Sequence, residues 1–151
     1  MNKKQKRSAR CLCMQLLYSL ELSNSYSNQD TIDYFFKTKD EDLDKVVYSK
    51  NEIEYAKKLL DYAKDHIQRI DTLIQKKLVN WDMHRLALID KIILRMCIAE
   101  MLYVEDVPPK VSMAEGIEIA KEFSTNDSSS FINGILDAIY NDSANKLEEI
   151  K

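Results

Sequence analysis

The side chains best suited to bind another molecule lie at the very start of the chain. Five cations fall within the first ten residues: Lys3, Lys4, Lys6, Arg7 and Arg10. Lysine and arginine neutralise the phosphates of a nucleic acid backbone. The rest of the chain contains 17 basic and 25 acidic residues, so its formal charge is −8, whereas that of the whole chain is −3. A basic segment on an acidic body predicts a localised site for an acidic partner.

The basic segment opens a predicted helix over residues 3–22. Its apolar residues recur at i, i+3, i+4 and i+7 and are Ala9, Leu12, Cys13, Leu16, Leu17 and Leu20. At about 100° per residue, Arg7, Met14 and Tyr18 project away from this stripe, and Arg10 lies at its flank. An outward tyrosine beside cations can stack on an unpaired RNA base. A merely solvated helix start is the alternative, although cations there oppose the helix dipole.

A second candidate surface lies at the start of the last predicted helix. The buried face of this helix is expected to hold Ile132, Ile135, Leu136 and Ile139. That face leaves Phe131 about a quarter-turn off its centre, one helical turn after Asp127, with Gly134 on the outer side. A half-exposed phenylalanine can stack on a base. It can equally cover the core, and both interpretations stay open at this point.

Residue types that support catalysis or metal binding are sparse. His66 and His84 have no neighbours at metal-ligand spacing. The sequence contains no G-x-S-x-G, Walker A or G-x-G-x-x-G motif. The three cysteines, Cys11, Cys13 and Cys97, are odd in number and cannot all pair in disulfides. They are therefore expected to be plain thiols in a reducing compartment. We therefore expect a protein that is not an enzyme and that needs no metal or cofactor.

The elements that position these side chains are all predicted to be helical, because 2 Gly and 2 Pro in 151 residues provide few turns for a sheet. After the first helix, helices are expected over residues 31–37, 51–78, 83–104 and 112–123, and from 127 onwards. Asp30 and Asp127 are the expected N-caps of the second and last helices, and Ser112 with Glu115 forms a capping box. The acidic stretch 40–44 is expected to be a loop or a poorly ordered helix. The sequence has neither a signal peptide nor a run long enough to span a membrane, so a cytoplasmic location is expected.

Several blocks of the sequence together resemble the NusB family. They are R-S-A-R (7–10), Q-L-L-Y (15–18), W-D-M-H-R-L-A-L-I-D-K-I-I-L-R (81–95), A-E-M-L-Y (99–103), V-P-P-K-V (107–111), A-E-G-I-E-I-A-K-E-F (114–123) and S-S-F-I-N-G-I-L-D (129–137). The last two blocks and the I-L-R segment are the most specific. Their order and spacing carry the resemblance along nearly the whole chain.

The resemblance implies one compact all-α domain of six to seven helices, arranged as two small helical bundles over residues 1–78 and 81–142, with a frayed tail at 143–151. It implies a transcription antitermination factor that binds boxA-type leader RNA of ribosomal RNA operons. The implied partners are the small-subunit ribosomal protein NusE, other Nus factors and RNA polymerase. The implied RNA-binding residues are Lys3, Lys4, Lys6, Arg7, Arg10, Tyr18, Asp127, Ser130 and Phe131. The contact with NusE is implied for the helix that carries Asp90.

The sequence departs from the family pattern at both RNA-binding segments. The N-terminal arm has more lysine than arginine, which reduces bidentate phosphate recognition. Ser129 and Ser130 stand where family members often carry histidine and lysine, so Phe131 lacks a neighbouring cation. The acidic body and the loss of lysine at Ser130 keep open the alternative of an acidic helical protein-interaction module with little intrinsic RNA binding. A homodimeric helical regulator is the third hypothesis.

Overall fold

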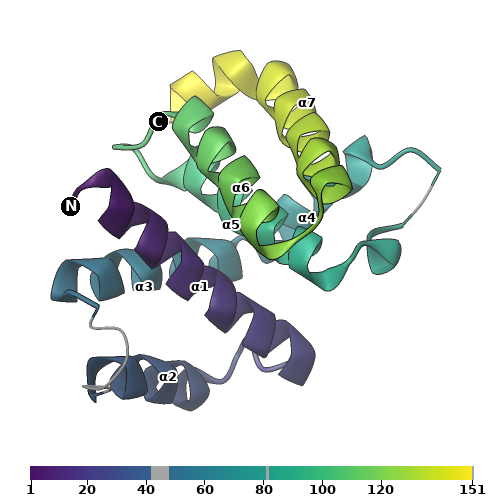
Figure 1. Cartoon of the computed structure of the whole chain (residues 1–151). Coiled ribbons are helices and arrows are strands. Elements are labelled where there is room, and N and C mark those ends of the chain that lie inside the picture. Colours follow the sequence, from purple (N-terminus) through teal and green to yellow (C-terminus); the bar gives the residue numbers. More distant parts are fainter. Residues whose placement is uncertain (42–47, 81, 151) are drawn as a thin grey trace. The chain divides into compact units, whose positions relative to one another are not determined.

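The computed structural model describes residues 1–41, 48–80 and 82–150, and in these ranges every regular element is a helix (Figure 1). The elements are α1 (Lys3–Ser23), α2 (Gln29–Glu41), α3 (Lys50–Asp65), α4 (Ile67–Lys77), a short 3₁₀ helix η1 (Met83–Arg85), α5 (Leu88–Tyr103), α6 (Pro109–Phe123) and α7 (Asn126–Ile150). The all-α prediction is therefore confirmed for the described part of the chain. None of its helices is both long and apolar enough to cross a membrane.

The chain divides into two compact units, Met1–Asp61 and Tyr62–Lys151, rather than near residue 80 as the sequence suggested. The difference arises because α4 packs on α5 and α7. The Tyr62 ring also stacks on Tyr103 of α5, with 5.6 Å between centroids. The guanidinium of Arg95 donates to both carboxylate oxygens of Asp71 on α4, at 2.8 Å each. These contacts assign residues 62–78 to the second unit.

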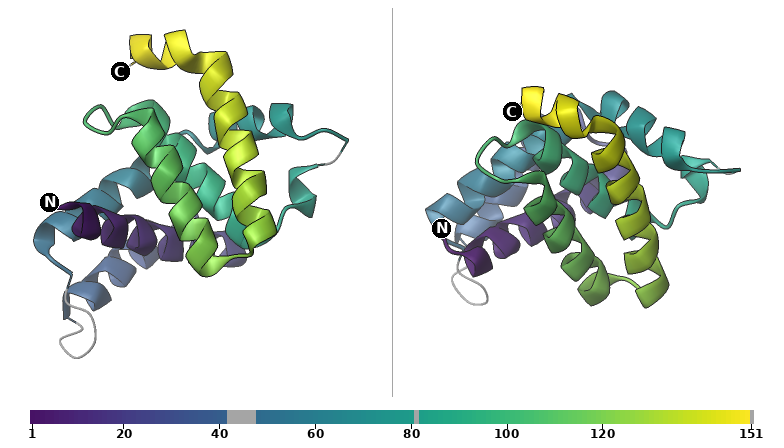
Figure 2. Two further views of the ribbon diagram at one scale, coloured as in Figure 1. Left: turned by 45° about the horizontal axis from the view of Figure 1, so that its top comes forward. Right: turned by 90° about the horizontal axis from the view of Figure 1, so that it is seen from above.

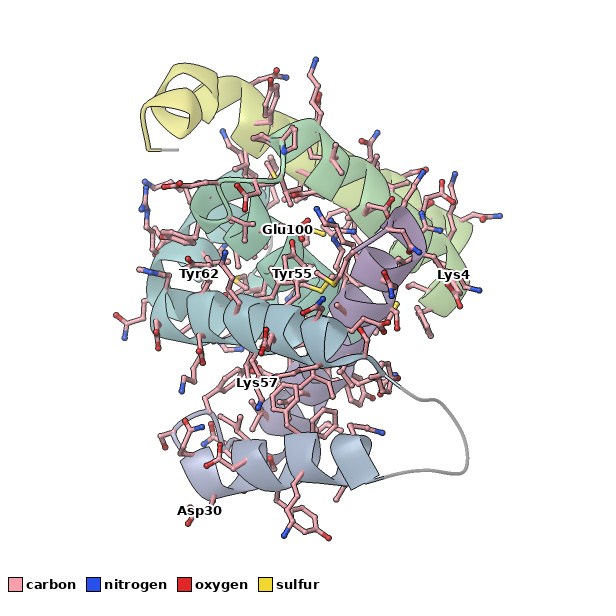
Figure 3. The ribbon with its side chains drawn as sticks, turned by 90° about the vertical axis from the view of Figure 1, so that its left-hand side faces the viewer. Lys4, Asp30, Tyr55, Lys57, Tyr62 and Glu100 are labelled. Carbon is pink, nitrogen blue, oxygen red and sulfur yellow. The ribbon has the colours of Figure 1, made fainter. Side chains whose placement is uncertain are left out.

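The first unit consists of α1, α2 and most of α3. Lys57 lies on the side of α3 that faces α2 (Figure 3). Its Nζ atom is 5.2 Å from the centre of the ring of Phe36, a fully buried residue of α2. The amide of Thr31 donates to Oδ1 of Asn28 at 3.1 Å, so Asn28 caps α2 and Asp30 lies in its first turn. The prediction of Asp30 as the cap was therefore wrong. Most of the acidic stretch 40–44 lies outside the described residues.

The predicted single helix over 51–78 is two helices, which are separated at His66. The backbone of His66 leaves the helical region, with φ −116° and ψ 21°. Its ring stacks on Tyr103 with 4.0 Å between centroids, so a contact with α5 accompanies the break. The apolar residues on both sides keep their helical spacing, and for this reason periodicity could not reveal the interruption.

The second unit is built around α5, whose residues from Ile92 to Leu102 are all buried. Helices α6 and α7 lie side by side against it (Figures 1 and 2). A Cβ atom on Gly116 of α6 would collide with Sγ of Cys97, so glycine permits the close approach of α6 to α5. The 83–104 helix is interrupted between η1 and Leu88, and the backbone of α7 continues beyond the expected fraying point at Asn141.

Helix α6 begins three residues earlier than predicted. Pro109 is its first residue, a position where the fixed φ of proline fits and its missing amide proton costs nothing. Ser112 and Glu115 are both buried inside this helix. The prediction that they form the capping box at its start was therefore wrong.

Candidate nucleic-acid interface

The basic start of α1 is held by a reciprocal capping pair that involves neither a carboxylate nor a lysine. The amide of Gln5 donates to Oδ1 of Asn2 at 2.8 Å, and the amide of Asn2 donates to Oε1 of Gln5 at 3.0 Å. The first turn contains no acidic residue. The capping pair satisfies two amides that the helix leaves without partners and so offsets the cost of placing cations near its positive end.

An outward stripe runs along α1 from Lys4 through Arg7 and Gln15 to Tyr18. Lys4 extends from the N-terminal end of the helix (Figure 3). Tyr18 is 39 % exposed. Lys3 is also exposed, whereas Lys6 and Arg7 are half-buried. The predicted outward position of Tyr18 is confirmed. We call the surface made by Lys3, Lys4, Lys6, Arg7 and Tyr18 the α1 surface.

Two side chains of α1 differ from the sequence expectation. Arg10 is 3 % exposed and Met14 is also buried. The buried arc of α1 covers more than half of its circumference and takes in both positions, whereas the prediction was a narrower apolar stripe centred on Leu16 and Leu20. Met14 therefore does not project outward, and the guanidinium of Arg10 is not on the surface in this conformation.

Tyr48, which precedes α3, has a half-buried side chain. Burial raises the pKa of its phenol, and the nearby Cys11 and Glu52 raise this pKa further. Cys11 is half-buried on α1, and Glu52 is on the first turn of α3. Tyr48 is therefore a neutral hydrogen-bonding group at physiological pH.

The start of α7 carries the second set of predicted residues. Asp127 and Ser130 are exposed, and Phe131 is half-buried, as its position on the helix predicted. The amide of Ser128 donates to Oγ1 of Thr125 at 3.0 Å, so Thr125 and not Asp127 caps the helix. Leaving the cap to Thr125 frees the Asp127 carboxylate for other hydrogen bonds. We call the surface made by Asp127, Ser130 and Phe131 the α7 surface.

Asp90 lies in the first turn of α5 and is only 6 % exposed. Its Oδ1 atom accepts a hydrogen bond from the hydroxyl of Ser124 at 3.0 Å, and Oδ2 accepts one from Ser128 at 2.9 Å. The two serines stand on either side of the connection between α6 and α7. The Asp90 carboxylate, on the helix for which the resemblance implied the contact with NusE, is thus engaged inside the second unit.

Gly134 follows Ser130 by one helical turn on the outer face of α7. A Cβ atom built there would meet nothing within 4 Å, so the surface beside Ser130 and Phe131 is open at this position. An extended ligand backbone could approach the helix there more closely than at a residue with a side chain.

Eight of the nine predicted RNA-binding residues thus lie on two surfaces, one in each unit, whereas Arg10 is buried. Sequence reasoning missed two features that hold them, although both left a signal. The spacing Asn2-x-x-Gln5 is that of a capping box. The hydroxyl residues from 124 to 130 indicated a hydrogen-bonded turn, but nothing in the sequence identified Asp90 as its acceptor. Within the described ranges, no three His, Cys, Asp or Glu side chains are grouped so that they could hold a metal.

Comparison with known proteins decides the family. The NusB family matches residues 7–141. The chain belongs to the NusB family. It is 44 % identical over 142 residues to the transcription antitermination protein NusB of Chloroherpeton thalassium and covers 64 % of that longer protein. It is 39 % identical over 137 residues to the protein of the same name from Syntrophus aciditrophicus, of which it covers 80 %.

Solved structures of NusB proteins have the same fold. T. maritima NusB superimposes with a TM-score of 0.74 at 32 % identity, and the match covers 90 % of each chain. A crystal structure of the antitermination factors NusB and NusE in complex with dsRNA matches with a TM-score of 0.77 at 28 % identity. That match covers 93 % of this chain and 98 % of the other.

Proposed function

We propose that this NusB-family chain is a transcription antitermination factor that binds boxA-type leader RNA together with NusE. The observation that carries the proposal is the α1 surface, where a neutral capping pair supports a helix start with four cations and no acid. The sequence identity of this chain to two transcription antitermination proteins also supports the proposal. So does the NusB structure that contains NusE and dsRNA.

The two surfaces offer different contacts to RNA. Lys3, Lys4, Lys6 and Arg7 supply the positive charge for phosphates, and Tyr18 supplies a ring for an unpaired base. On the α7 surface, Phe131 supplies a second ring. Asp127 and Ser130 can accept hydrogen bonds from base amino groups or ribose hydroxyls, because both are exposed.

We place the contact with NusE on the helix that carries Asp90. Asp90 itself is buried, whereas Leu88 and Ile89 in the same first turn are half-buried. Half-exposed aliphatic side chains at a helix start suit the apolar centre of a protein interface. The complex is proposed to act on RNA polymerase with other Nus factors, in the cytoplasm where bacterial leader RNA is made. It acts by binding, and we assign no catalytic step to it.

Fluorescence anisotropy with a boxA-type RNA, with and without NusE, tests this function. The control is an RNA of identical length and composition in scrambled order. We expect the boxA-type RNA to bind at least tenfold more tightly, and more tightly again with NusE present.

A different outcome would favour the alternative of an acidic interaction module, which the charge of the body and the serine at position 130 support. In that case NusE is captured at full strength, but neither RNA binds to the chain or to the complex. Light scattering on the RNA-free protein tests the homodimer hypothesis, because a homodimer has twice the molar mass of one chain.

A further inference from the structure

We propose that Asp90 is a positioning residue for the α7 surface: its buried carboxylate fixes the turn from which Asp127, Ser130 and Phe131 project. This inference rests on the proposed function, since it gives Asp90 a role in RNA binding that is exercised entirely from inside the protein. It differs from the partner contact that the family resemblance implied for this part of α5.

Asp90 bridges Ser124 and Ser128 through its two carboxylate oxygens, and we call these two hydrogen bonds the clamp. Each oxygen of Asp90 accepts one hydroxyl, from Ser124 at 3.0 Å and from Ser128 at 2.9 Å. Ser124 is the C-cap of α6, and Ser128 lies in the first turn of α7. One side chain of α5 therefore holds both ends of the short connection between two helices. Hydrogen bonds to an ionised acceptor are stronger than those between neutral groups, and this one is shielded from water.

The clamp adjoins all three residues of the α7 surface. Asp127 immediately precedes Ser128, Ser130 follows it by two residues, and Phe131 follows it by three. Two further bonds order the same turn, because Ser128 donates its amide to Thr125 and Ser129 donates its hydroxyl to the carbonyl of Asn126 at 2.8 Å. Those bonds are local to the turn, whereas the bonds to Asp90 attach it to α5.

Loss of the clamp should weaken RNA binding through entropy. Without Asp90 the turn can adopt several conformations, and RNA would have to select the one that presents Phe131 correctly. The apparent affinity falls by the fraction of molecules in that conformation. Asp90 is buried and negative, so it does not itself touch phosphate, and its removal should leave the number of phosphate contacts unchanged.

The test compares Asp90→Ala with the isosteric Asp90→Asn and with a control pair, Asp71→Ala and Asp71→Asn. Asp71 of α4 also pairs with a side chain of α5, that of Arg95, but neither residue belongs to the α6–α7 connection. We expect Asp90→Ala to bind boxA-type RNA about tenfold more weakly, with an unchanged salt slope. Asp90→Asn should lose threefold or less, because an amide can accept from one serine and donate to the other. The Asp71 variants should bind RNA as the wild type does.

Two further readouts separate positioning from general destabilisation. Amide hydrogen exchange in Asp90→Ala should accelerate over residues 124–131 and not over α4. In the Phe131→Ala background, Asp90→Ala should cost less than threefold, because the two changes act on the same contact.

Three results would overturn the inference. These are wild-type affinity in Asp90→Ala, full additivity with Phe131→Ala, or unchanged exchange over residues 124–131. A loss of NusE binding with RNA binding intact would instead assign Asp90 to the protein partner. If the wild type binds no RNA, it is the proposed function that fails, and this outcome is recognised before any variant is compared.

Discussion

The start of α1 and the start of α7 are both proposed to contact RNA, yet they are built in different ways. The α1 surface is rich in charge and is supported locally, by two residues three positions apart. The α7 surface has no cation among its three residues and is supported from a distance, by a carboxylate that precedes Ser128 by 38 residues. The first can be recognised from a short segment of sequence, whereas the second exists only once α5, α6 and α7 have packed.

This difference predicts that charge and stacking divide between the two surfaces. Affinity that depends on salt should come from α1, because each phosphate contact releases counterions. Affinity that does not depend on salt should come from α7, because base stacking involves no net charge. The following variants test that division, from the largest expected effect to the smallest.

Removing three cations from the α1 surface should have the largest effect. In the variant Lys4→Ala/Lys6→Ala/Arg7→Ala, the log–log salt slope should fall by about 2, since each single-strand phosphate contact contributes about 0.7. That change corresponds to about 100-fold weaker binding near ~0.1 M salt. A salt titration of anisotropy with the boxA-type RNA measures both quantities.

The matched control removes three exposed lysines from other helices of the first unit, in Lys37→Ala/Lys50→Ala/Lys58→Ala. Net charge changes equally in both variants, so only the position of the charge differs. Equal losses in the two variants would show that the acidic or basic balance of the unit, rather than the α1 surface, controls binding.

Phe131→Ala should weaken RNA binding by about tenfold, since stacking of a base on an aromatic ring contributes about 1–3 kcal/mol. The salt slope should stay the same, in contrast to the α1 variant. The control is Ile132→Val, which removes a methyl group from the neighbouring buried residue and should cost about 1 kcal/mol of stability without changing RNA affinity. A reduced slope in Phe131→Ala would contradict the division of roles.

Ser130→Lys should give the α7 surface a positive charge, which is the property that distinguishes the α1 surface. One added phosphate contact should raise the slope by about 0.7 and tighten binding about fivefold near ~0.1 M salt. Ser130→Gln is the control of similar length without the charge. If Ser130→Lys tightens RNA binding no more than Ser130→Gln does, phosphates do not pass close to this end of α7.

Gly134→Ala should have the smallest effect on RNA binding, and it should change RNA affinity and protein stability in opposite directions. Because a Cβ atom there meets open space, helix propensity should raise the free energy of unfolding by about 0.5–1 kcal/mol. If the RNA backbone approaches this glycine closely, affinity should fall by about twofold to threefold even though the protein is more stable. Chemical denaturation and anisotropy on the same sample measure the two changes.

Gly116→Ala is the opposite case and serves as the control. The new methyl group would collide with Sγ of Cys97 in a packed core, so stability should fall by about 1–2 kcal/mol despite the better helix propensity. The double variant Gly116→Ala/Cys97→Ala should recover most of that loss. Stabilisation by Gly116→Ala alone would show that α5 and α6 pack less closely than described.

The sequence by itself determined the helical class, the approximate extent of α1 and the outward position of Tyr18. These features depend on short-range periodicity and on the scarcity of glycine and proline, and both can be read within one segment. The basic start of α1 belongs to the same group, because its cations and its capping pair are neighbours along the chain.

Tertiary structure alone decided the features that depend on contacts between distant residues. The break at His66 coincides with stacking on Tyr103, and the burial of Arg10 and Met14 reflects a core that extends over more than half of α1. The assignment of α4 to the second unit follows from its packing on α5 and α7. Asp90 became the acceptor for Ser124 and Ser128 in the same way, because its partners lie more than 30 residues away and hydrogen-bond partners at that distance leave no periodic signal in the sequence.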